Sequence, residues 1–318
     1  MTMRVLLSAP YMVPIVDRFR PIFDDVGIQL IVPTVIERLS EEELLSYAGE
    51  VDGVLCGDDR FSASVLKAYA PRLKVISKWG TGIDAIDSHA AAQLGVQVCN
   101  TLAAFTDPVA DSVMSYILAF ARSVPWMNQA MKSGRWDKIP GRALRECTLG
   151  VVGVGNIGKA VLCRGRAFGM RLLGNDIVEI DTAFLWDVRV EMVTLAQLLD
   201  VADFVSLNCD LNPTSYHLIN SEALAKMPPH AVLINTSRGQ VVDEQALINA
   251  LQSGQIAGAG LDVFEDEPLP LDHPFLSMEH VLLSPHNANS SPSAWERVHW
   301  NSVRNLFIGL GLEFPEEM

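Results

Sequence analysis

The sequence predicts an α/β protein that contains two parallel-sheet domains. Three observations support this prediction. The chain has 318 residues, of which 49% are hydrophobic, so it is long enough for two buried cores. Short apolar runs alternate with longer amphipathic segments, and this alternation starts again after residue 145. Strand–helix alternation indicates parallel strands with helices packed on the faces of the sheet.

The N-terminal part of the chain contains four apolar runs that we expect to be buried strands. Each run is short and ends in turn residues, as strands of a parallel sheet do. The runs are MRVLLSA (3–9), VDGVLCG (51–57), LKVISKWG (73–80) and VQVCNT (96–101). The amphipathic segments 39–50, 62–71 and 85–95 between them are predicted to be helices.

The second half of the chain contains six further runs of the same kind. They are TLGVVGVG (148–155), MRLLGND (170–176), FVSLNC (204–209), AVLINTS (231–237), AGAGLDVF (257–264) and VLLSPH (281–286). These runs predict a second parallel sheet.

Two long helices are expected to connect the two halves. In segment 106–124, Thr106 or Asp107 can cap the N-terminus and Pro108 suits the first turn. The apolar residues that fall on one face of this helix are Val109, Val113, Ile117, Phe120 and Val124. Segment 293–314 is also predicted to be helical and would return the C-terminus to the first domain. We therefore expect a discontinuous domain, 1–101 plus 287–318, and a second domain, 102–286, with a cleft between them.

Composition limits the possible partners and the location of the protein. The formal net charge is −14, and such a surface repels nucleic-acid phosphates and anionic lipids. No stretch reaches the roughly 20 apolar residues of a membrane span. We therefore expect neither a nucleic-acid nor a membrane partner. Five single cysteines without a CxxC pair indicate reduced thiols and a cytoplasmic location. The histidines show no metal-ligand spacing, so no metal is expected.

A glycine-rich turn between a predicted strand and a predicted helix indicates a dinucleotide site. Gly153, Gly155 and Gly158 form G-x-G-x-x-G in the segment GVVGVGNIGKA. The first glycine allows a tight turn, the second lets the backbone approach a pyrophosphate, and the third allows close packing of helix on strand. The helix N-terminus then attracts the negative charge of the pyrophosphate.

The surroundings of this turn favour NAD. Asp176 ends the next predicted strand about 20 residues later, where a carboxylate binds the adenosine ribose hydroxyls. No arginine follows to receive a 2′-phosphate, so NAD is favoured over NADP. The same segment matches the phosphate-loop pattern G-x-x-x-x-G-K, but Ala160 stands where that motif needs a Ser or Thr for Mg²⁺. The nucleotide-hydrolase interpretation is therefore rejected.

Three later segments resemble the signature sequences of the D-isomer-specific 2-hydroxyacid dehydrogenases. These segments are VLINTSRGQVVDEQALINAL, AGAGLDVFEDEPLP and LLSPHNAN. The family includes phosphoglycerate, glyoxylate/hydroxypyruvate and D-lactate dehydrogenases. The likeness extends from SKWGTGIDAID to the C-terminal helix. It implies two Rossmann-like domains, a flavodoxin-like substrate domain and an NAD domain, and hydride transfer between nicotinamide and C2 of a small D-2-hydroxy or 2-oxo acid.

The resemblance also implies roles for three residues. Reduction of a 2-oxo acid requires an anchored carboxylate, a polarised carbonyl and a proton at the oxygen. By resemblance, Arg238 is the substrate clamp and His286 the acid/base. Glu267 then orients His286 and favours its charged form. Glu265 and Asp266 are neighbouring carboxylates, but the family position falls on Glu267.

Further site residues are carried over from the same family. By resemblance, Thr81 and Gly82 lie in the loop whose backbone N–H groups bind the substrate carboxylate, and Lys78 matches a position that is often basic. An ordinary turn lysine is the alternative interpretation of Lys78. The expected cofactor-binding residues are Gly153, Gly155, Asn156, Ile157, Gly158, Asp176, Cys209, Thr236 and Asp262.

The chain departs from the family pattern at several positions. It has NTLAAF where members often have NTPxxN, Asp111 where a Glu is usual, and LNCDLN where LHxPLT is usual. Asn156 replaces a frequent arginine. These changes lie near the cofactor and leave the three catalytic residues intact. The formate branch is disfavoured, because its members usually have Gln at the position of Glu267 and Asn at that of Phe105.

Two questions concern function class and assembly. A corepressor-like NAD(H)-sensing protein on the same fold is the alternative to an enzyme, and such proteins retain the same three residues. The segment 122–138 resembles an arm that packs across a homodimer interface in the family, with Trp126 and Trp136 as expected anchors. An intrachain helix is the alternative. The side chain of the substrate is left open, with Tyr11, Met12 and Trp295 as candidate pocket residues.

Overall fold

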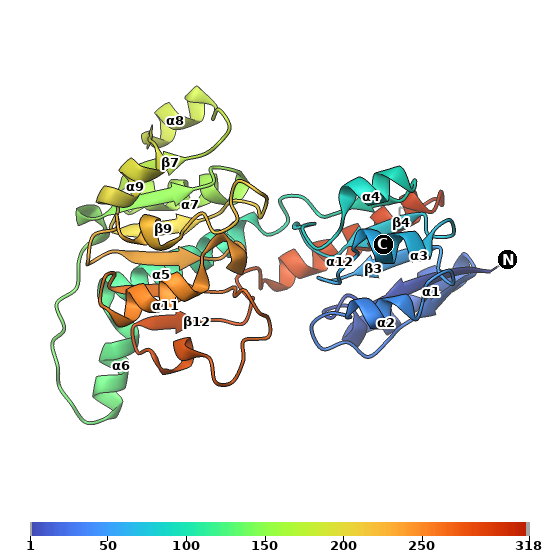
Figure 1. The fold of residues 1–318 in the computed structure, drawn as a ribbon, viewed down its shortest axis with the longest axis horizontal. Coiled ribbons are helices and arrows are strands. Elements are labelled where there is room, and N and C mark those ends of the chain that lie inside the picture. The colour runs from blue at the N-terminus through green and yellow to red at the C-terminus, as the bar shows by residue number, and fades with distance from the viewer. Residues whose placement is uncertain (1, 316–318) are drawn as a thin grey trace. The chain divides into compact units, whose positions relative to one another are not determined.

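The computed structural model describes residues 2–315, which form two compact units. Unit 1 comprises Met1–Ala104 and Ser291–Met318, and unit 2 comprises Phe105–Ser290. The boundaries predicted from the sequence, after residues 101 and 286, lie three and four residues before these positions. Each unit contains one sheet in which every strand pair is parallel (Figure 1).

Unit 1 contains a five-stranded sheet in the order β2-β1-β3-β4-β5. Its strands are β1 (Met3–Leu7), β2 (Ile28–Ile31), β3 (Gly53–Cys56), β4 (Val75–Lys78) and β5 (Gln97–Cys99). The four predicted strands are present. The edge strand β2 was not predicted, and it contains only four residues.

Helices cover the sheet of unit 1. They are η1 (Val13–Arg18), α1 (Arg20–Asp25), α2 (Glu41–Leu45), α3 (Ala63–Tyr69), α4 (Ser88–Gln93) and α12 (Pro292–Gly309). The C-terminal helix α12 packs on β3, β4 and β5, so the chain returns to this unit as predicted. The rings of Phe23 in α1 and Phe307 in α12 lie 5.5 Å apart, which places both helices on one side of the sheet.

Unit 2 contains a seven-stranded sheet in the order β12-β11-β10-β9-β6-β7-β8. Its strands are β6 (Thr148–Val152), β7 (Arg171–Asn175), β8 (Val190–Met192), β9 (Phe204–Leu207), β10 (Val232–Asn235), β11 (Gly258–Leu261) and β12 (Val281–Leu283). The six predicted strands are present, and the three-residue edge strand β8 was missed. The first strand of this sheet in the sequence, β6, lies inside the sheet. The chain adds β7 and β8 on one side of β6 and then β9 to β12 on the other side, so the strand order reverses at β6. Open parallel sheets bind ligands at such a switch point, beyond the carboxyl ends of the strands.

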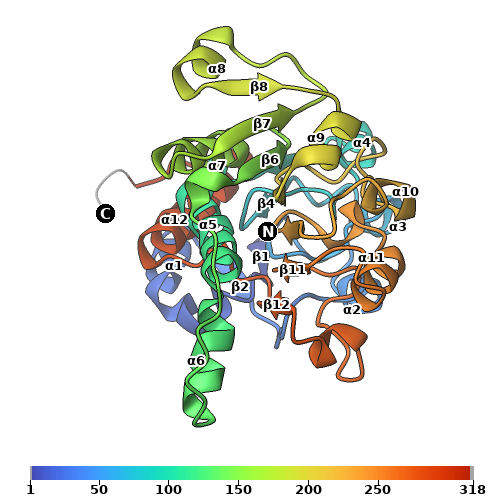
Figure 2. The same ribbon diagram turned by 90° about the vertical axis from the view of Figure 1, so that its left-hand side faces the viewer.

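The helices of unit 2 lie on both faces of its sheet. They are α5 (Thr106–Arg122), α6 (Val124–Lys132), η2 (Leu144–Glu146), α7 (Asn156–Ala167), α8 (Thr182–Val188), α9 (Leu195–Val201), α10 (Ser221–Leu224), η3 (Gly239–Val241), α11 (Glu244–Gln252) and η4 (Pro274–Ser277). Figure 2 shows α5 and α7 on one face and α9, α10 and α11 on the other. Each face buries its own apolar cluster.

The predicted helix 106–124 requires two corrections. Ser123 has a φ of 52°, in the left-handed region, so α5 ends at Arg122 and α6 begins at Val124. Val124 is therefore exposed rather than on the apolar face, whereas Val109, Val113 and Ile117 are buried as predicted. The proposed side-chain caps are also absent, because the helix already begins at Thr106 with Phe105 as its N-cap.

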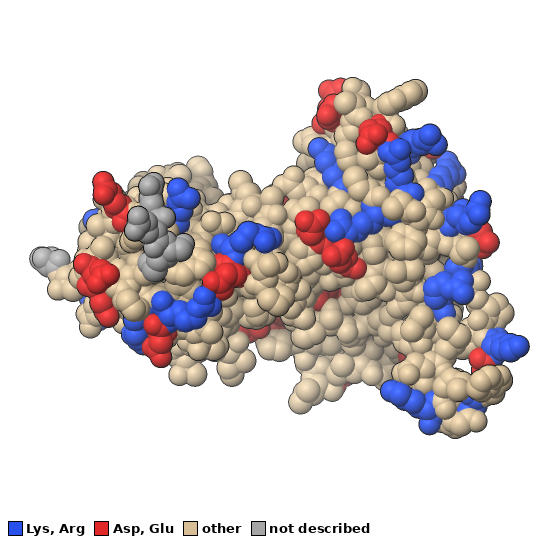
Figure 3. All heavy atoms as spheres, turned by 180° about the vertical axis from the view of Figure 1, so that it is seen from behind, with Lys and Arg blue, Asp and Glu red and all other residues tan. Residues whose placement is uncertain are grey.

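The surface of the protein carries both signs of charge. On the face drawn in Figure 3, Lys and Arg side chains lie interspersed with Asp and Glu. Examples in unit 2 are Arg164, which pairs with Asp107 and Asp111, and Arg171, which pairs with Glu191. Within residues 2–315, none of the helices is both long and apolar enough to cross a membrane.

Candidate functional site

The glycine-rich turn follows β6 and begins α7. Gly153 has a φ of +86°, and a Cβ there would lie 2.6 Å from the backbone nitrogen of Cys209. A Cβ on Gly158 would lie 2.0 Å from the carbonyl oxygen of Gly153. Gly155 differs, because a Cβ there would have no heavy atom within 4 Å. The turn is thus packed against protein at its first and third glycines and open at its second.

The residues around this turn fit a dinucleotide. Gly155 is the N-cap of α7 and is exposed together with Asn156, so the N–H groups at the start of this helix are accessible to an anion. Two buried oxygen atoms beyond neighbouring strands, Asn208 Oδ1 after β9 and Thr236 Oγ1 after β10, have no hydrogen-bond partner among the described residues. Buried polar atoms normally have hydrogen-bond partners, so these two oxygens indicate a site for a polar ligand.

Asp176 lies directly after β7, beside the turn. Its Oδ2 accepts a hydrogen bond of 2.6 Å from Val154 N, and its Oδ1 accepts one of 3.0 Å from Val178 N. The carboxylate is thereby fixed next to the glycine-rich turn, where a ribose would follow a pyrophosphate. Cys209 is half-buried near the same turn, and burial raises the pKa of its thiol to about 11.

Arg238 lies in a short connection between β10 and η3. Asn235 fixes this connection, since its Nδ2 donates to Arg238 O at 2.8 Å and its Oδ1 accepts from Ser237 N at 3.0 Å. The guanidinium of Arg238 donates from Nη1 to Ser237 O at 2.8 Å. The side chain is therefore held at the carboxyl end of β10 by short-range contacts.

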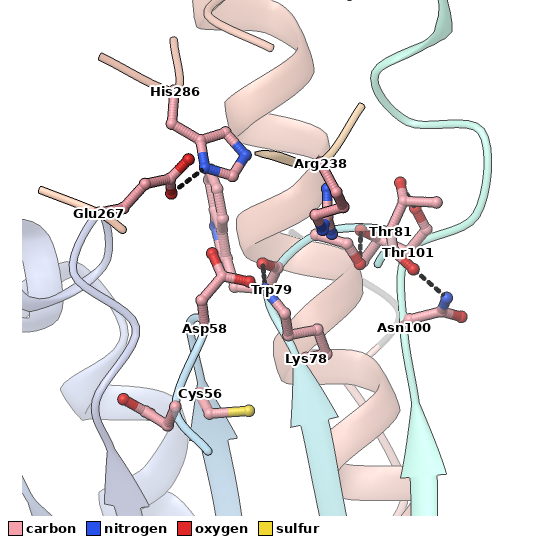
Figure 4. Close-up of polar contacts among 12 residues, drawn as sticks. Cys56, Asp58, Lys78, Trp79, Thr81, Asn100, Thr101, Arg238, Glu267 and His286 are labelled. Atoms are coloured by element: carbon pink, nitrogen blue, oxygen red, sulfur yellow. Dashed lines mark hydrogen bonds and ion pairs between the residues drawn. The ribbon is translucent and has the colours of Figure 1, made fainter. Parts of the chain in front are cut away.

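Glu267 and His286 form a pair within unit 2. Glu267 Oε2 lies 2.8 Å from His286 Nδ1 (Figure 4), and both side chains are partly exposed. Glu267 Oε1 accepts from Phe264 N at 3.0 Å, which fixes the carboxylate. A carboxylate only accepts hydrogen bonds, so Nδ1 of His286 carries a proton and Nε2 is directed elsewhere. Of the three neighbouring acids, Glu267 is the one that contacts the histidine.

The backbone of His286 is in a strained conformation that Asp262 supports. His286 has a φ of +49°, which non-glycine residues rarely adopt outside constrained sites. Asp262 accepts hydrogen bonds of 2.8 Å from the backbone N–H groups of Asn287 and Ala288, and a further one from the Ser284 hydroxyl. His286 N donates to Asp262 O at 2.7 Å. Burial raises the pKa of the Asp262 carboxyl, and these hydrogen bonds oppose that shift.

In unit 1, the predicted substrate residues lie where β4 ends. Thr81 Oγ1 donates to Thr101 O at 3.1 Å, and Asn100 Nδ2 donates to Thr81 O at 2.5 Å (Figure 4). These bonds fix the loop that contains Thr81 and Gly82 against the segment after β5. Thr81 and Gly82 are both partly exposed.

Lys78 is buried and paired. Its Nζ lies 3.0 Å from Asp58 Oδ1 and donates to Trp79 O at 3.1 Å, and its side chain is only 5% exposed. Both contacts of this ammonium group are visible in Figure 4. Lys78 was expected from the sequence but its partner Asp58 was not, because an acid that follows another strand gives no local signal of the pairing.

An aromatic cluster lies beside Lys78 in unit 1. The ring of Tyr11 lies 4.8 Å from the rings of both Trp79 and Trp295. Trp79 Nε1 donates to His299 Nδ1 at 2.9 Å. Met12, a predicted pocket residue, is fully buried in the core instead. Tyr11 and Trp295 are partly exposed, as a ligand-facing role requires.

The described residues contain no group of three or more His, Cys, Asp or Glu side chains suited to hold a metal ion.

This chain is similar in sequence and in structure to several known proteins. Residues 114–288 match the family model described as D-isomer specific 2-hydroxyacid dehydrogenase, NAD binding domain. A glyoxylate reductase of Thermofilum pendens is 41% identical over 87% of this chain and 83% of its own length. A hydroxypyruvate reductase of Thermotoga maritima is 37% identical over 87% of this chain and 90% of its own. A D-lactate dehydrogenase of Aquifex aeolicus, solved with NAD and lactic acid, superposes with a TM-score of 0.84 at 28% identity, covering 95% and 93% of the two chains.

Proposed function

Because the chain belongs to the D-isomer-specific 2-hydroxyacid dehydrogenases and is an NAD-dependent oxidoreductase, we propose that Arg238, Glu267 and His286 are its catalytic residues. The observation that carries this proposal is the pairing of Glu267 with Nδ1 of His286 at 2.8 Å. That pairing fixes the imidazole and leaves its Nε2 as the atom that exchanges a proton with substrate.

The chemistry divides among the residues as follows. When bound, NADH supplies the hydride that reaches C2 of a 2-oxo acid. His286, protonated on both nitrogens, delivers the Nε2 proton to the oxygen at C2, and Glu267 stabilises the cationic ring before delivery. Arg238 binds the substrate carboxylate through its planar fork and polarises the carbonyl group. Thr81 and Gly82 contribute backbone N–H groups to the same carboxylate.

We assign the cofactor contacts from the same geometry. The N–H groups of Asn156 and Ile157 at the start of α7 would hold the pyrophosphate, with Gly153 and Gly158 supporting the turn and Gly155 leaving room for it. Asp176 would bind the adenosine ribose. Cys209, Thr236 and Asp262 complete the proposed set, and the unpartnered Thr236 hydroxyl supports its assignment in particular.

The substrate is proposed to be a small 2-oxo acid without a phosphate group. The buried ammonium of Lys78 is balanced by Asp58 at 3.0 Å, so this position offers a second anionic group little net positive charge. Relatives named glyoxylate reductase and hydroxypyruvate reductase act on acids of this size. We therefore expect glyoxylate or hydroxypyruvate to be preferred over phosphohydroxypyruvate.

The test is the loss of NADH absorbance with purified protein and a panel of 2-oxo acids. The panel contains glyoxylate, hydroxypyruvate, pyruvate, phosphohydroxypyruvate and 2-oxoglutarate. We expect turnover on the two smallest polar acids, and we expect His286→Asn to reduce kcat by roughly 10²- to 10⁴-fold while NADH binding persists. No turnover on any acid, with NADH bound tightly, would favour the corepressor-like alternative.

A homodimer and a cytoplasmic location complete the proposal. In unit 2, α6 and the segment after it project from the sheet (Figure 2), and Trp136 in that segment is 79% exposed. Trp126, the other predicted anchor, instead donates to Glu279 O at 2.9 Å and packs on Phe120. Trp136 thus supports a partner contact, and light scattering would measure the assembly. The five cysteines are all unpaired, which supports a reducing compartment.

A further inference from the structure

Two glutamates outside the proposed catalytic set bond to each other's backbone. Glu265 lies in the loop after β11, and Glu244 is the first residue of α11. Glu244 N donates to Glu265 Oε1 at 3.2 Å, and Glu265 N donates to Glu244 Oε2 at 3.2 Å. This reciprocal arrangement joins the loop to the helix at one point.

Each carboxylate is also bound by a histidine. His217 Nε2 lies 2.9 Å from Glu265 Oε1, and His273 Nε2 lies 3.0 Å from Glu244 Oε1. Since carboxylates only accept, each histidine carries its proton on Nε2. His273 Nδ1 accepts from Phe275 N at 3.3 Å, so the neutral form of this ring already satisfies both contacts. The four residues form one continuous series of hydrogen bonds, in which the two glutamates are joined through their backbone N–H groups.

This chain of hydrogen bonds connects the segments that contain Arg238 and Glu267. Glu265 precedes Glu267 by two residues. Gln240, two residues after Arg238, donates from Nε2 to Glu265 O at 2.8 Å, and His217 N donates to Gln240 O at 2.9 Å.

The two segments also touch through their backbones. A Cβ on Gly239 would lie 1.9 Å from the carbonyl carbon of Phe264, so there is no room between the segments. A shift of one segment would therefore be transmitted to the other.

We propose that Glu265, supported by Glu244, is a positioning residue that holds Glu267 in place relative to Arg238. This inference rests on the proposed function. Glu265 does not contact His286. It acts by fixing the loop whose Glu267 carboxylate orients the proton-carrying ring, and by tying that loop through His217 to Gln240, two residues after Arg238. Loss of Glu265 leaves His217 and Glu244 N without their acceptor and frees the loop.

The decisive experiment compares Glu265→Ala and Glu265→Gln with the matched control Asp266→Asn. Asp266 is the adjacent acid on the same loop, and it is exposed. Displacement of a catalytic group by about 1 Å costs up to roughly 100-fold, so we expect Glu265→Ala to lose about 10- to 100-fold in kcat. The Km for NADH should stay unchanged. Glu265→Gln keeps an oxygen that accepts from His217 and from Glu244 N, so it should recover most of the loss, and Asp266→Asn should behave as wild type.

A second measurement does not depend on turnover. The ring resonances of His286, identified by their loss in His286→Asn, are followed by NMR against pH. We expect their titration midpoint to move to lower pH in Glu265→Ala, because a mobile Glu267 stabilises the cationic ring less. A merely structural role would lower the melting temperature and leave the midpoint and the kcat at lower temperature unchanged.

The outcomes separate the two proposals. Wild-type protein that reduces no 2-oxo acid contradicts the proposed function, and the NMR midpoint still decides on Glu265. An active wild type whose kcat and midpoint survive Glu265→Ala within twofold overturns the positioning role alone. An equal loss in Asp266→Asn also overturns it. If Glu265→Ala does not fold, Glu244→Ala is measured in its place, because it removes the acceptor of Glu265 N and of His273. A wild-type kcat and a wild-type midpoint in Glu244→Ala overturn the inference.

Discussion

Replacing Gly158 and Gly155 separately with alanine tests the glycine-rich turn, because the structure predicts different results for the two changes. Alanine normally stabilises a helix interior by about 1 kcal/mol over glycine. At Gly158, however, the new Cβ would lie 2.0 Å from the carbonyl oxygen of Gly153 and 3.1 Å from Val151 Cγ1. The nearest neighbour is backbone, so rotation of a side chain cannot relieve the overlap.

The size of the effect at Gly158 follows from that distance. The turn must move by about 1.4 Å to bring this pair of atoms to an ordinary contact of about 3.4 Å, and overpacking of this kind costs about 1–3 kcal/mol, occasionally more. This cost exceeds the gain in helix propensity. For a unit of this size, about 2 kcal/mol corresponds to a decrease of roughly 4–8 °C in Tm. We expect Gly158→Ala to lose both stability and NADH affinity.

Gly155→Ala is the matched change. Its Cβ would have nothing within 4 Å, and its φ of −75° suits alanine, so the Tm should stay within about 1 °C of wild type. The methyl group would instead occupy the space where a pyrophosphate approaches the backbone. We expect NADH affinity to fall at least about tenfold, or 1.4 kcal/mol.

Differential scanning calorimetry and NADH fluorescence titration measure both quantities. Wild-type NADH affinity in Gly155→Ala would refute the assigned approach of the pyrophosphate. Unchanged stability in Gly158→Ala would refute the packing argument. Reversal of the two results would show that the open side of the turn has been misidentified.

Three further predictions concern single groups. Burial lowers the pKa of His299 below 6.5, and its Nδ1 accepts a hydrogen bond from Trp79, so the fold stabilises the neutral ring. The free energy of unfolding should therefore be highest above pH 6.5 and should fall as the pH decreases through the lowered pKa. Urea titrations should show a smaller decrease in the His299→Gln variant. Burial raises the pKa of Cys209 to about 11, so iodoacetamide at pH 8 should modify the exposed Cys163 before Cys209. Mass spectrometry of the peptides measures the order of labelling, and equal labelling of the two thiols would contradict the prediction. Asp176→Ala removes a negative charge that would repel a 2′-phosphate. The ratio of kcat/KM for NADH to kcat/KM for NADPH should therefore decrease by about tenfold or more. An unchanged ratio would argue against the assignment of Asp176 to the ribose.

Local patterns in the sequence were sufficient for most of the fold. All ten predicted strands are present. They needed no tertiary information, because a buried parallel strand is recognisable from its own residues. The edge strands β2 and β8 were not predicted. They contain only four and three residues, and only part of each is buried. The break at Ser123 was missed because a left-handed serine has no clear sequence signal.

Family likeness, rather than local chemistry, indicated the site residues. The glycine spacing and the carboxylate that follows β7 were predicted from their own positions. Arg238, Glu267 and His286 are separated by up to 48 residues, and only their resemblance to family motifs grouped them. The structure added the contact that distinguishes Glu267 from Glu265 and Asp266, namely its 2.8 Å approach to His286.

The sequence by itself determined the strand–helix alternation and the dinucleotide turn, because each depends on residues close together in the chain. Only the tertiary structure decided the acid–base pairs that no sequence motif indicated. Asp58 neutralises Lys78 and Glu265 joins Glu244 to His217, through contacts between segments about 20 to 50 residues apart. Hydrogen bonds of this kind depend on distances of a few ångströms that arise only when separate strands end at the same edge of a sheet.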